Sequence, residues 1–324
     1  MTVGDGVGTG KVFHYVNGKY DLHQRVYRMF DFSEKITAKY FYYYFSNHFY
    51  DRVMAMTAKT SVDSVRYEMI ADMDIALPEI QEQVAISDCF DNLDNLITLH
   101  QRKFEKLTNV KKSMLEKMFP QNGSSYPEIR FKGFTDPWEQ RKLGDIADIV
   151  GGGTPSTGNQ SYWDGDIDWY APAEIADQIY ANSSQKKITG LGYENSSAKM
   201  LPPGTVLFTS RAGIGKTAIL TRKGCTNQGF QSIVPHRGEL DSYFIFSRTE
   251  ELKRYGELVG AGSTFVEVSG KQMAVMELMM PPTMREQQTI GGFFQQLDHL
   301  ITLHQRELEK LQNIKKSMLE KMFV

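Results

Sequence analysis

The heptapeptide LITLHQR at residues 96–102 occurs a second time at residues 300–306. It belongs to a longer repeat, because residues 82–119 align without gaps on residues 286–323, at an offset of 204, with 26 identities in 38 positions. Repetition at a fixed offset predicts two copies of one structural unit. The nearly constant back part of each copy indicates that it does the same work twice.

Upstream of this constant block the repeat is fainter. Residues 73–78 resemble residues 276–281 with a one-residue shift, and Tyr40-Phe41 can be laid on Tyr243-Phe244. Each copy therefore has a divergent front part, which suggests two related tasks that differ in detail.

The constant block has the pattern of a long amphipathic helix. Residues 80–119 contain no proline or glycine, and their apolar residues recur at steps of three and four, close to a coiled-coil seam. The second copy carries Gly291-Gly292, which predicts looser or kinked first turns. One helix cannot bury so narrow a stripe, so we expect the two to pack antiparallel with approximate two-fold symmetry. His100 and His304 share one core-like position, where a polar residue would fix the register.

Residues 126–275 have a pattern typical of a mixed α/β domain. Short β-branched and aromatic runs, at residues 145–150, 167–170 and 204–209, alternate with clusters of glycine, proline, serine and asparagine. A helix is expected from Ser242 to Val259. The predicted fold class is α+β, with many loops that are suited to recognition.

The composition excludes several classes of protein. Hydrophobic residues make up 41 % of the 324 residues and the formal net charge is −2, which argues against a strongly basic DNA-coating protein. Cys89 and Cys225 lie far apart and no Cys/His cluster has zinc-site spacing, so a reducing compartment is favoured. No apolar run is long enough to span a membrane and no secretory pattern is visible, so we expect a cytoplasmic protein.

Residues 213–217 (GIGKT) resemble the end of a phosphate-binding loop, which would indicate a nucleotide hydrolase. The full motif needs a glycine where Ser210 stands. A tight glycine turn between two strands, presenting Arg211 and Lys216, is therefore the favoured interpretation. Residues 8–11 (GTGK) are its counterpart in the first copy.

The sequence contains no evident catalytic constellation. The Pro-Pro pairs at residues 202–203 and 281–282 do not fit the Asn/Asp-Pro-Pro-aromatic motif that a methyltransferase needs. Asp164, Asp166 and Asp168 alternate along a loop and strand, and we interpret them as turn residues on a solvated face.

A local set of aromatic, basic and amide side chains is a candidate DNA-binding surface. Arginine, lysine, asparagine and glutamine pair with base edges, whereas ordinary packing and a solvated face are the alternative interpretations. The candidates are Thr154, Ser156, Thr157, Tyr162, Trp163, Arg211, Lys216, Asn227 and Gln228, with Lys11 and Gln24 as counterparts in the first copy.

Five motifs and the helical repeats together are specific for one family. The motifs lie at residues 127–134 (PEIRFKGF), 138–145 (WEQRKLGD), 152–157 (GGTPST), 162–167 (YWDGDI) and 210–217 (SRAGIGKT). On these residues the chain resembles the specificity (S) subunit of type I restriction-modification enzymes, over nearly its whole length.

The resemblance implies a partial first target-recognition domain at residues 1–77 and a first conserved long helix at residues 78–120. A second target-recognition domain at residues 121–280 and a second conserved long helix at residues 281–324 would follow. Each domain would read one half of a bipartite site in double-stranded DNA, and the antiparallel, coiled-coil-like helices would set the spacing.

The resemblance also implies partners and a division of labour. Methyltransferase (M) subunits would bring S-adenosylmethionine and catalysis, and restriction (R) subunits would join for cleavage. No cofactor, metal or catalytic residue is expected on this chain. A full member of the family would carry a counterpart of residues 127 to about 205 before residue 1, so the resemblance implies that the first domain is about half present. An alternative function is therefore a truncated scaffold or decoy that binds the M subunit without competent bipartite DNA reading.

Overall fold

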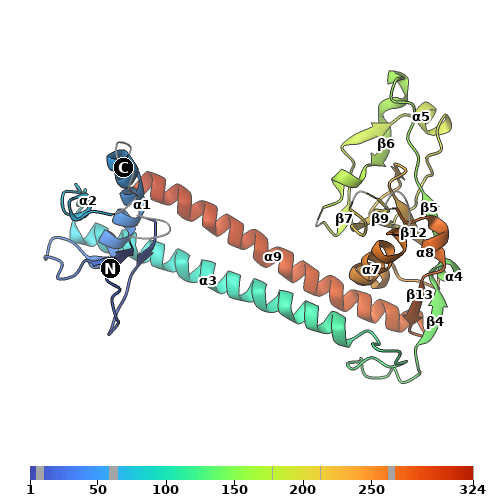
Figure 1. Cartoon of the computed structure of the whole chain (residues 1–324), viewed down its shortest axis with the longest axis horizontal. Helices are drawn as coiled ribbons and strands as arrows, with labels where there is room; N and C mark the ends of the chain where they lie inside the picture. The colour runs from blue at the N-terminus through green and yellow to red at the C-terminus, as the bar shows by residue number, and fades with distance from the viewer. Residues whose placement is uncertain (5–10, 58–64, 177, 212, 262–266, 324) are drawn as a thin grey trace. The chain divides into compact units, whose positions relative to one another are not determined.

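A computed structural model describes residues 1–4, 11–57, 65–176, 178–211, 213–261 and 267–323. The chain divides into two compact units (Figure 1). Unit 1 comprises Met1–Lys106 and Thr302–Val324, and unit 2 comprises Leu107–Ile301. Both units combine helices with small sheets, which confirms the α+β class. In the described part of the chain, every helix is too short or too polar to cross a membrane.

Two long helices each contribute to both units. Helix α3 spans Ile80–Lys117 and helix α9 spans Met284–Met322, close to the predicted residues 78–120 and 281–324. The predicted loosening at Gly291-Gly292 is wrong, because α9 runs unbroken through both glycines. A Cβ at Gly291 would lie 2.7 Å from Asp241 Oδ1, so a close approach of the neighbouring segment explains this glycine.

Within each unit, the beginning of one long helix packs against the end of the other. In unit 1, Phe90 stacks on Phe323 and Asp94 forms an ion pair with Lys315. The repeat-related contacts in unit 2 have the helices exchanged; they are the Phe119–Phe294 stack and the ion pair between Lys111 and Asp298. In each unit, residue numbers rise along one helix as the numbers of their contact partners fall along the other, which confirms the predicted antiparallel pairing.

Unit 2 is built on a five-stranded sheet of order β5-β12-β9-β10-β7. Its strands are β5 (Ala147–Gly151), β12 (Gln231–Pro235), β9 (Val206–Phe208), β10 (Thr217–Leu220) and β7 (Tyr180–Ala181). Phe208, Ile233 and Phe244 are completely buried in its core. Helices α6 (Ser242–Ser247), α7 (Thr249–Gly260) and α8 (Gly270–Ala274) follow. The single helix predicted over residues 242–259 is thus interrupted at Arg248.

Two smaller sheets complete unit 2. One has the order β11-β6-β8, from β11 (Cys225–Thr226), β6 (Trp163–Tyr170) and β8 (Lys186–Ile188), with helix α5 (Gly190–Glu194) nearby. The other pairs β4 (Glu139–Lys142) with β13 (Glu277–Met280). The expected strand at residues 145–150 is only partly right, because a short helix α4 (Leu143–Ile146) precedes β5.

Unit 1 repeats the second half of unit 2 in reduced form. Its sheet has the order β2-β1-β3, from β1 (Thr2–Gly4), β2 (Phe13–His14) and β3 (Val26–Arg28), which matches β10-β9-β12. Helices α1 (Ala38–Thr57) and α2 (Tyr67–Ala71) follow in the places of α6–α7 and α8. Val3, Phe45, Phe49 and Met69 form its core.

One glutamine contact fixes the alignment of the two units. Gln83 Oε1 accepts from the N–H of Thr37 at 2.9 Å, and Gln287 Oε1 accepts from the N–H of Asp241 at 3.0 Å. Gln83 and Gln287 are 204 residues apart, and so are Thr37 and Asp241. At this offset Tyr40 corresponds to Phe244, one residue away from the alignment made on the sequence.

Candidate nucleic-acid interface

The glycine loop after β5 lies directly against the segment that follows β11. A Cβ at Gly152 would lie 2.0 Å from the carbonyl oxygen of Asn227, and the N–H of Gly153 donates to Thr226 at 2.9 Å. Only glycine permits this approach of the two backbones. As a result, Thr154 Oγ1 donates to Gln228 Oε1, and two predicted site segments meet.

Two tryptophans fix the other side of this loop. Trp163 Nε1 donates to the carbonyl of Ser156 at 3.1 Å, and Trp169 Nε1 donates to the carbonyl of Gly153 at 2.8 Å. The two indoles meet edge to face with their centroids 5.1 Å apart. Trp163 therefore has the packing role that the sequence left open, while Ser156 and Thr157 remain exposed on the loop. Tyr162, in the 3-10 turn Gln160–Tyr162, is partly buried.

The turn between β9 and β10 confirms the predicted tight glycine turn. Thr209 Oγ1 accepts from the N–H of Lys216 at 2.9 Å and donates to the carbonyl of Gly213 at 2.7 Å. Gly213 and Gly215 have φ of +104° and +96°, which other residues rarely adopt. A phosphate-binding loop places its lysine at the start of a helix, whereas Thr217 begins strand β10, so the hydrolase interpretation is wrong.

Arg211, in this turn, lies close to the segment after β11 that also contacts the glycine loop. The N–H of Ser210 donates to Gly229 at 2.8 Å, and a Cβ at Gly229 would lie 3.0 Å from Asn227 Oδ1 and 3.5 Å from Arg211 Nε. Thr154, Arg211, Asn227 and Gln228 therefore form one cluster, which we call the recognition cluster. Lys216 is exposed on the same turn.

Two buried hydroxyls add to the polar character of this region. Ser210 Oγ and Thr226 Oγ1 are buried without a hydrogen-bond partner among the described residues. Ser210 directly precedes Arg211, and Thr226 directly precedes Asn227. The recognition cluster itself combines one cation, two amides and one hydroxyl, a set that suits the mixed donors and acceptors of base edges and phosphates.

Asp168 was misinterpreted from the sequence. Asp164 and Asp166 are exposed, and Asp164 has a positive φ of 60°, as expected for turn residues. Asp168, by contrast, is 3 % exposed and accepts from the N–H and Oγ of Ser184 at 3.0 Å and from Arg222 Nε at 2.6 Å. Burial alone raises its pKa, but the hydrogen bonds from Ser184 and Arg222 outweigh burial and hold the pKa below its ordinary value.

The first-copy candidates belong to unit 1, whereas the recognition cluster belongs to unit 2. Lys11 is exposed in unit 1, with its Nζ 4.2 Å from the centroid of the Tyr50 ring. Gln24 is exposed in the turn before β3. Gly8 and Gly10, the predicted counterparts of Gly213 and Gly215, lie outside the described residues. The comparison of the two turns therefore stays a prediction.

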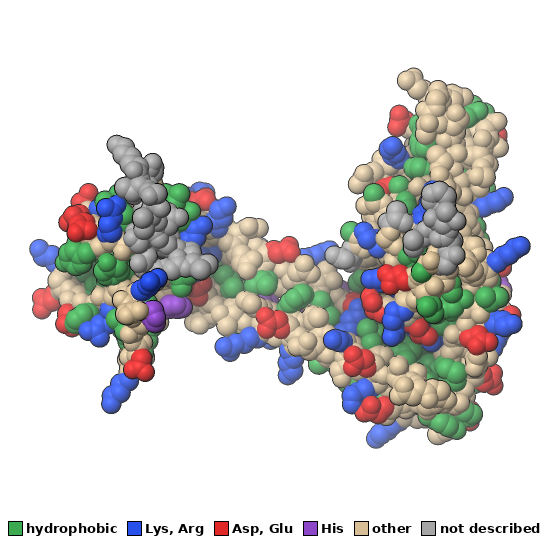
Figure 2. Space-filling model, viewed as in Figure 1, with side chains coloured by type: hydrophobic (Ala, Val, Ile, Leu, Met, Phe, Trp, Pro, Cys, Tyr) green, Lys and Arg blue, Asp and Glu red, His purple; other side chains and the backbone are tan. Residues whose placement is uncertain are grey.

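Charge on the surface is mixed. Lysine and arginine side chains are interspersed with acidic ones on the face drawn in Figure 2, with no single large basic patch there. Among the described residues no group of three or more His, Cys, Asp or Glu side chains could hold a metal ion. Cys89 and Cys225 are both free thiols, and burial raises the pKa of Cys225 to about 11.

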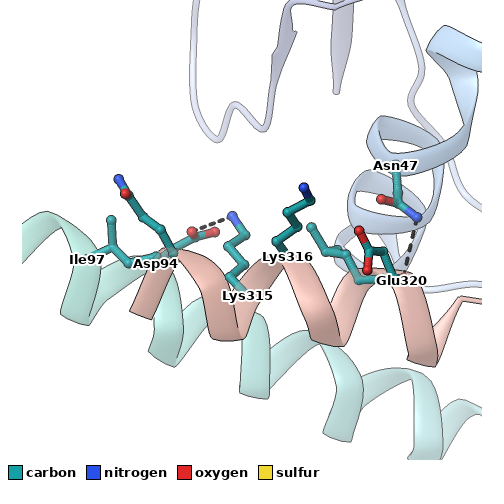
Figure 3. Close-up of a pocket in the computed structure, with 8 residues that line it drawn as sticks. Asn47, Asp94, Ile97, Lys315, Lys316 and Glu320 are labelled. Carbon is teal, nitrogen blue, oxygen red and sulfur yellow. Dashed lines mark hydrogen bonds and ion pairs between the residues drawn. The ribbon is translucent and has the colours of Figure 1, made fainter. Parts of the chain in front are cut away.

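A groove in unit 1 offers a second concave surface (Figure 3). It has a volume of about 450 Å³ and lies among residues of α1, α3 and α9. Asn47 donates to the carbonyl of Leu319 at one side, and the ion pair between Asp94 and Lys315 lies at the other. Lys316 extends from α9 between these contacts, and no dashed contact reaches it in Figure 3.

Comparison with known families identifies the protein family to which the chain belongs. Residues 1–109 and 135–313 match the family described as the type I restriction modification DNA specificity domain. The chain belongs to this family. The match covers most of both long helices, up to residue 109 of α3 and residue 313 of α9, and the residues of the recognition cluster.

Relatives within the type I specificity family are longer than this chain. The type I restriction enzyme MjaIX specificity subunit of Methanocaldococcus jannaschii is 34 % identical over 190 residues, which are 58 % of this chain and 44 % of that protein. The EcoR124I/EcoR124II specificity subunit of Escherichia coli is 26 % identical over 170 residues, or 50 % of this chain and 41 % of that protein. The chain thus spans less than half the length of either relative.

Solved structures share the fold. The HsdS subunit from Thermoanaerobacter tengcongensis superimposes with a TM-score of 0.54 at 18 % identity, covering 90 % of this chain and 70 % of that one. The S subunit from M. genitalium gives a TM-score of 0.62 at 14 % identity, covering 90 % and 73 %. At these identities the likeness establishes the architecture of small α/β units on paired helices, and no more.

Proposed function

We propose that the chain is a DNA sequence-recognition subunit of a type I restriction-modification complex and performs no catalysis itself. Membership of the specificity family supports this proposal. The single observation that carries it is the recognition cluster, because the fold gathers Thr154, Arg211, Asn227 and Gln228 from three separate loops. Arginine and amide side chains held on loops are the groups that read base edges.

In this proposal, unit 2 reads one half of a bipartite target. The glycine loop and the β9–β10 turn approach one groove of the duplex, Arg211 and the amides contact base edges, and Lys216 contacts a phosphate. The fixed backbone contacts around Gly152 and Gly229 pre-organise these loops, so that little conformational entropy is lost on binding.

The paired helices and the unit 1 groove are proposed to bind the protein partners. M subunits would supply S-adenosylmethionine and methyl transfer, and R subunits would join for cleavage. The groove near Asp94 and Lys316 combines apolar and charged lining residues, as the rim of a protein interface does.

A gel-shift assay of the chain with its M subunit tests the proposal. The duplexes carry the full bipartite target, as found by mapping methylated sites in the host, or either half alone. Preference for the full target supports bipartite reading. Binding to one half-site or to neither, with the M subunit still bound, would instead support the truncated scaffold or decoy.

A further inference from the structure

In unit 2, the small sheet β11-β6-β8 contains a buried carboxylate that is not part of the recognition cluster. Asp168 on β6 is 3 % exposed, and its Oδ1 accepts from the N–H and Oγ of Ser184 at 3.0 Å. Its Oδ2 lies 2.6 Å from Arg222 Nε, and Lys187 Nζ lies 3.7 Å from Oδ1. Burying a carboxylate is costly, and an apolar residue at this place in a sheet would avoid that cost. The cations that Asp168 holds therefore need an explanation.

Arg222 is fixed by its own segment as well as by Asp168. Residues 222–224 pack tightly on β6, because a Cβ at Gly224 would lie 3.2 Å from the Tyr170 ring and 3.3 Å from the carbonyl oxygen of Asp168. In addition, the N–H of Leu201 donates to the carbonyl of Gly224 at 2.8 Å. The Arg222 side chain is nevertheless 50 % exposed. Because the ion pair uses Nε, the terminal Nη groups can reach a ligand outside the protein.

The position of Arg222 relates it to the recognition cluster. Arg222 precedes strand β11 and Asn227 follows it, and the N–H of Asn227 donates to the carbonyl of Tyr170 at 3.0 Å. Five residues of extended chain span at most about 18 Å, and the phosphates of one DNA strand follow one another at about 3.4 Å of helix axis. A duplex whose bases lie against the amides of the recognition cluster therefore has several phosphates within this distance of Asn227.

Net charge does not make this part of unit 2 attractive to DNA. Lys187 and Lys223 add positive charge beside Arg222, but β6 also carries the exposed Asp164 and Asp166. A cation in such surroundings contributes to DNA binding through its placement. A guanidinium that is held in one orientation loses little conformational freedom when it binds a phosphate, and its planar fork suits two phosphate oxygens.

We propose that Asp168 is a positioning residue for DNA binding, which holds the Arg222 guanidinium so that its Nη groups bind a DNA phosphate beside the bases that the recognition cluster reads. This inference rests on the proposed function of unit 2 and adds to it a contact that fixes the register of the recognition cluster on the duplex. Asp168 itself does not touch the DNA, since it is buried and negatively charged.

Substitution of Arg222 tests the phosphate contact. Fluorescence anisotropy of the chain with its M subunit is measured on the mapped target duplex and on duplexes with one base pair changed. Arg222→Gln is expected to weaken binding to all of them by about the same tenfold factor, and to make the salt dependence shallower by about one, because a phosphate contact carries no sequence information. Arg141→Gln is the matched control and leaves binding unchanged, since Arg141, on strand β4, is a surface arginine paired with Glu239.

Asp168→Asn separates positioning from simple electrostatics. The substitution removes a negative charge, so without a positioning role it would strengthen DNA binding. We expect it instead to weaken binding by about five- to tenfold, and to add little to the loss in the Arg222→Gln chain, because both act through one guanidinium. If thermal melting shows that Asp168→Asn does not fold, Arg222→Lys decides. This variant keeps the charge without the fork, so it should keep the salt dependence and lose about threefold in affinity.

The outcomes distinguish this proposal from the proposed function. No binding of DNA by the unaltered protein overturns the proposed function, and this inference with it. Binding by the unaltered protein that Arg222→Gln leaves unchanged overturns this inference alone. A loss that alters preference at one base position assigns Arg222 to a base and overturns the phosphate contact. Stronger binding by the Asp168→Asn chain, or full affinity of the Arg222→Lys chain, overturns the positioning role.

Discussion

Arg211 stands at a point where local backbone geometry and recognition chemistry coincide. Its neighbour Ser210 is fixed to Gly229 through the backbone, and its guanidinium lies beside Gly229 and Asn227. Arg211 is only partly buried. It belongs to the recognition cluster because the fold places it close to the amide side chains, which are distant from it in sequence. Its sequence neighbours alone, in a glycine-rich turn, indicated a basic residue on a loop and no more.

Arg211→Ala is expected to weaken binding of the assembled complex to its target DNA by about 1–3 kcal/mol, and to relax preference at one base position. Fluorescence anisotropy with duplexes varied at each position measures both effects. Arg237→Ala, at the opposite end of β12, is the control and should bind as the unaltered protein does. Unchanged affinity together with unchanged base preference would exclude Arg211 from the interface.

His100 and His304 illustrate a second residue-scale effect. Their Nδ1 atoms lie 3.1 Å apart, so one Nδ1 donates a hydrogen bond and the other accepts it. If both Nδ1 atoms carried a proton, the two rings would repel each other. Burial lowers the pKa of His304 from its ordinary value, and the nearby His100 and Lys103 lower it further. The predicted role as a register-fixing polar pair is compatible with this contact.

Acid should therefore loosen the helix pair in unit 1. Because the pKa of His304 is lower in the folded chain than in the unfolded chain, its contribution to stability is complete above about pH 6.5 and is lost as the pH falls through the folded value. Thermal melting followed by circular dichroism should show a drop between about pH 7.5 and about pH 5.5. His304→Gln should reduce this drop, whereas His299→Gln, an exposed histidine on α9, should not. An equal drop in both variants would contradict this assignment.

At the scale of elements, the repeat places one type of aspartate–lysine ion pair between the long helices in each unit, and the two pairs differ in their exposure to solvent. Asp298 accepts from Tyr243 Oη at 2.9 Å and from Lys111 at 2.6 Å, and its side chain is 8 % exposed. Asp94 accepts from Tyr43 Oη at 3.0 Å and from Lys315 at 2.5 Å, with its side chain 38 % exposed. Because solvent screens the more exposed pair, the Asp94–Lys315 pair should contribute less to the free energy of unfolding than the Asp298–Lys111 pair.

Asp298→Asn is expected to lower the free energy of unfolding by about 2–3 kcal/mol, because it leaves Lys111 without its partner in a largely buried place. Asp94→Asn should cost about 1 kcal/mol or less. Urea titrations of both variants provide the comparison, each serving as the control for the other. A larger loss for the exposed aspartate would refute the argument from burial.

The elements also show which parts of the fold a sequence can specify. The long helices were predictable because apolar spacing over some 40 residues leaves little choice, and the repeat predicted their pairing. Gly291 looked like a weak point, yet it is required by the close approach of Asp241, a contact made by residues distant in sequence. Asp168 was missed for the same reason, because its partners Ser184 and Arg222 come from other segments.

At the scale of the whole molecule, the two units are unequal versions of one plan. Both contain the three central strands, the following helices and the glutamine contact of Gln83 or Gln287. Among the residues that the structure describes, only those of unit 2 form the flanking strands β5 and β7 and the small sheet β11-β6-β8, which bring the glycine loop and its tryptophans to the recognition cluster. The candidate site could be predicted as separate motifs, but its assembly into one cluster depends on these long-range strand pairings.

The charge of the whole chain constrains how it can bind DNA. With a formal net charge of −2, the chain has no general attraction to the duplex, and only local cations such as Lys216 can neutralise phosphates. For about two to four such contacts, the logarithm of the binding constant should fall against the logarithm of salt concentration with a slope of about −2 to −4. Anisotropy titrations at several salt concentrations measure the slope. Lys216→Ala should make it shallower by about one, whereas Arg237→Ala should not. A slope near −8 would mean that a much larger basic surface binds the DNA, and that the recognition cluster is only a small part of the interface.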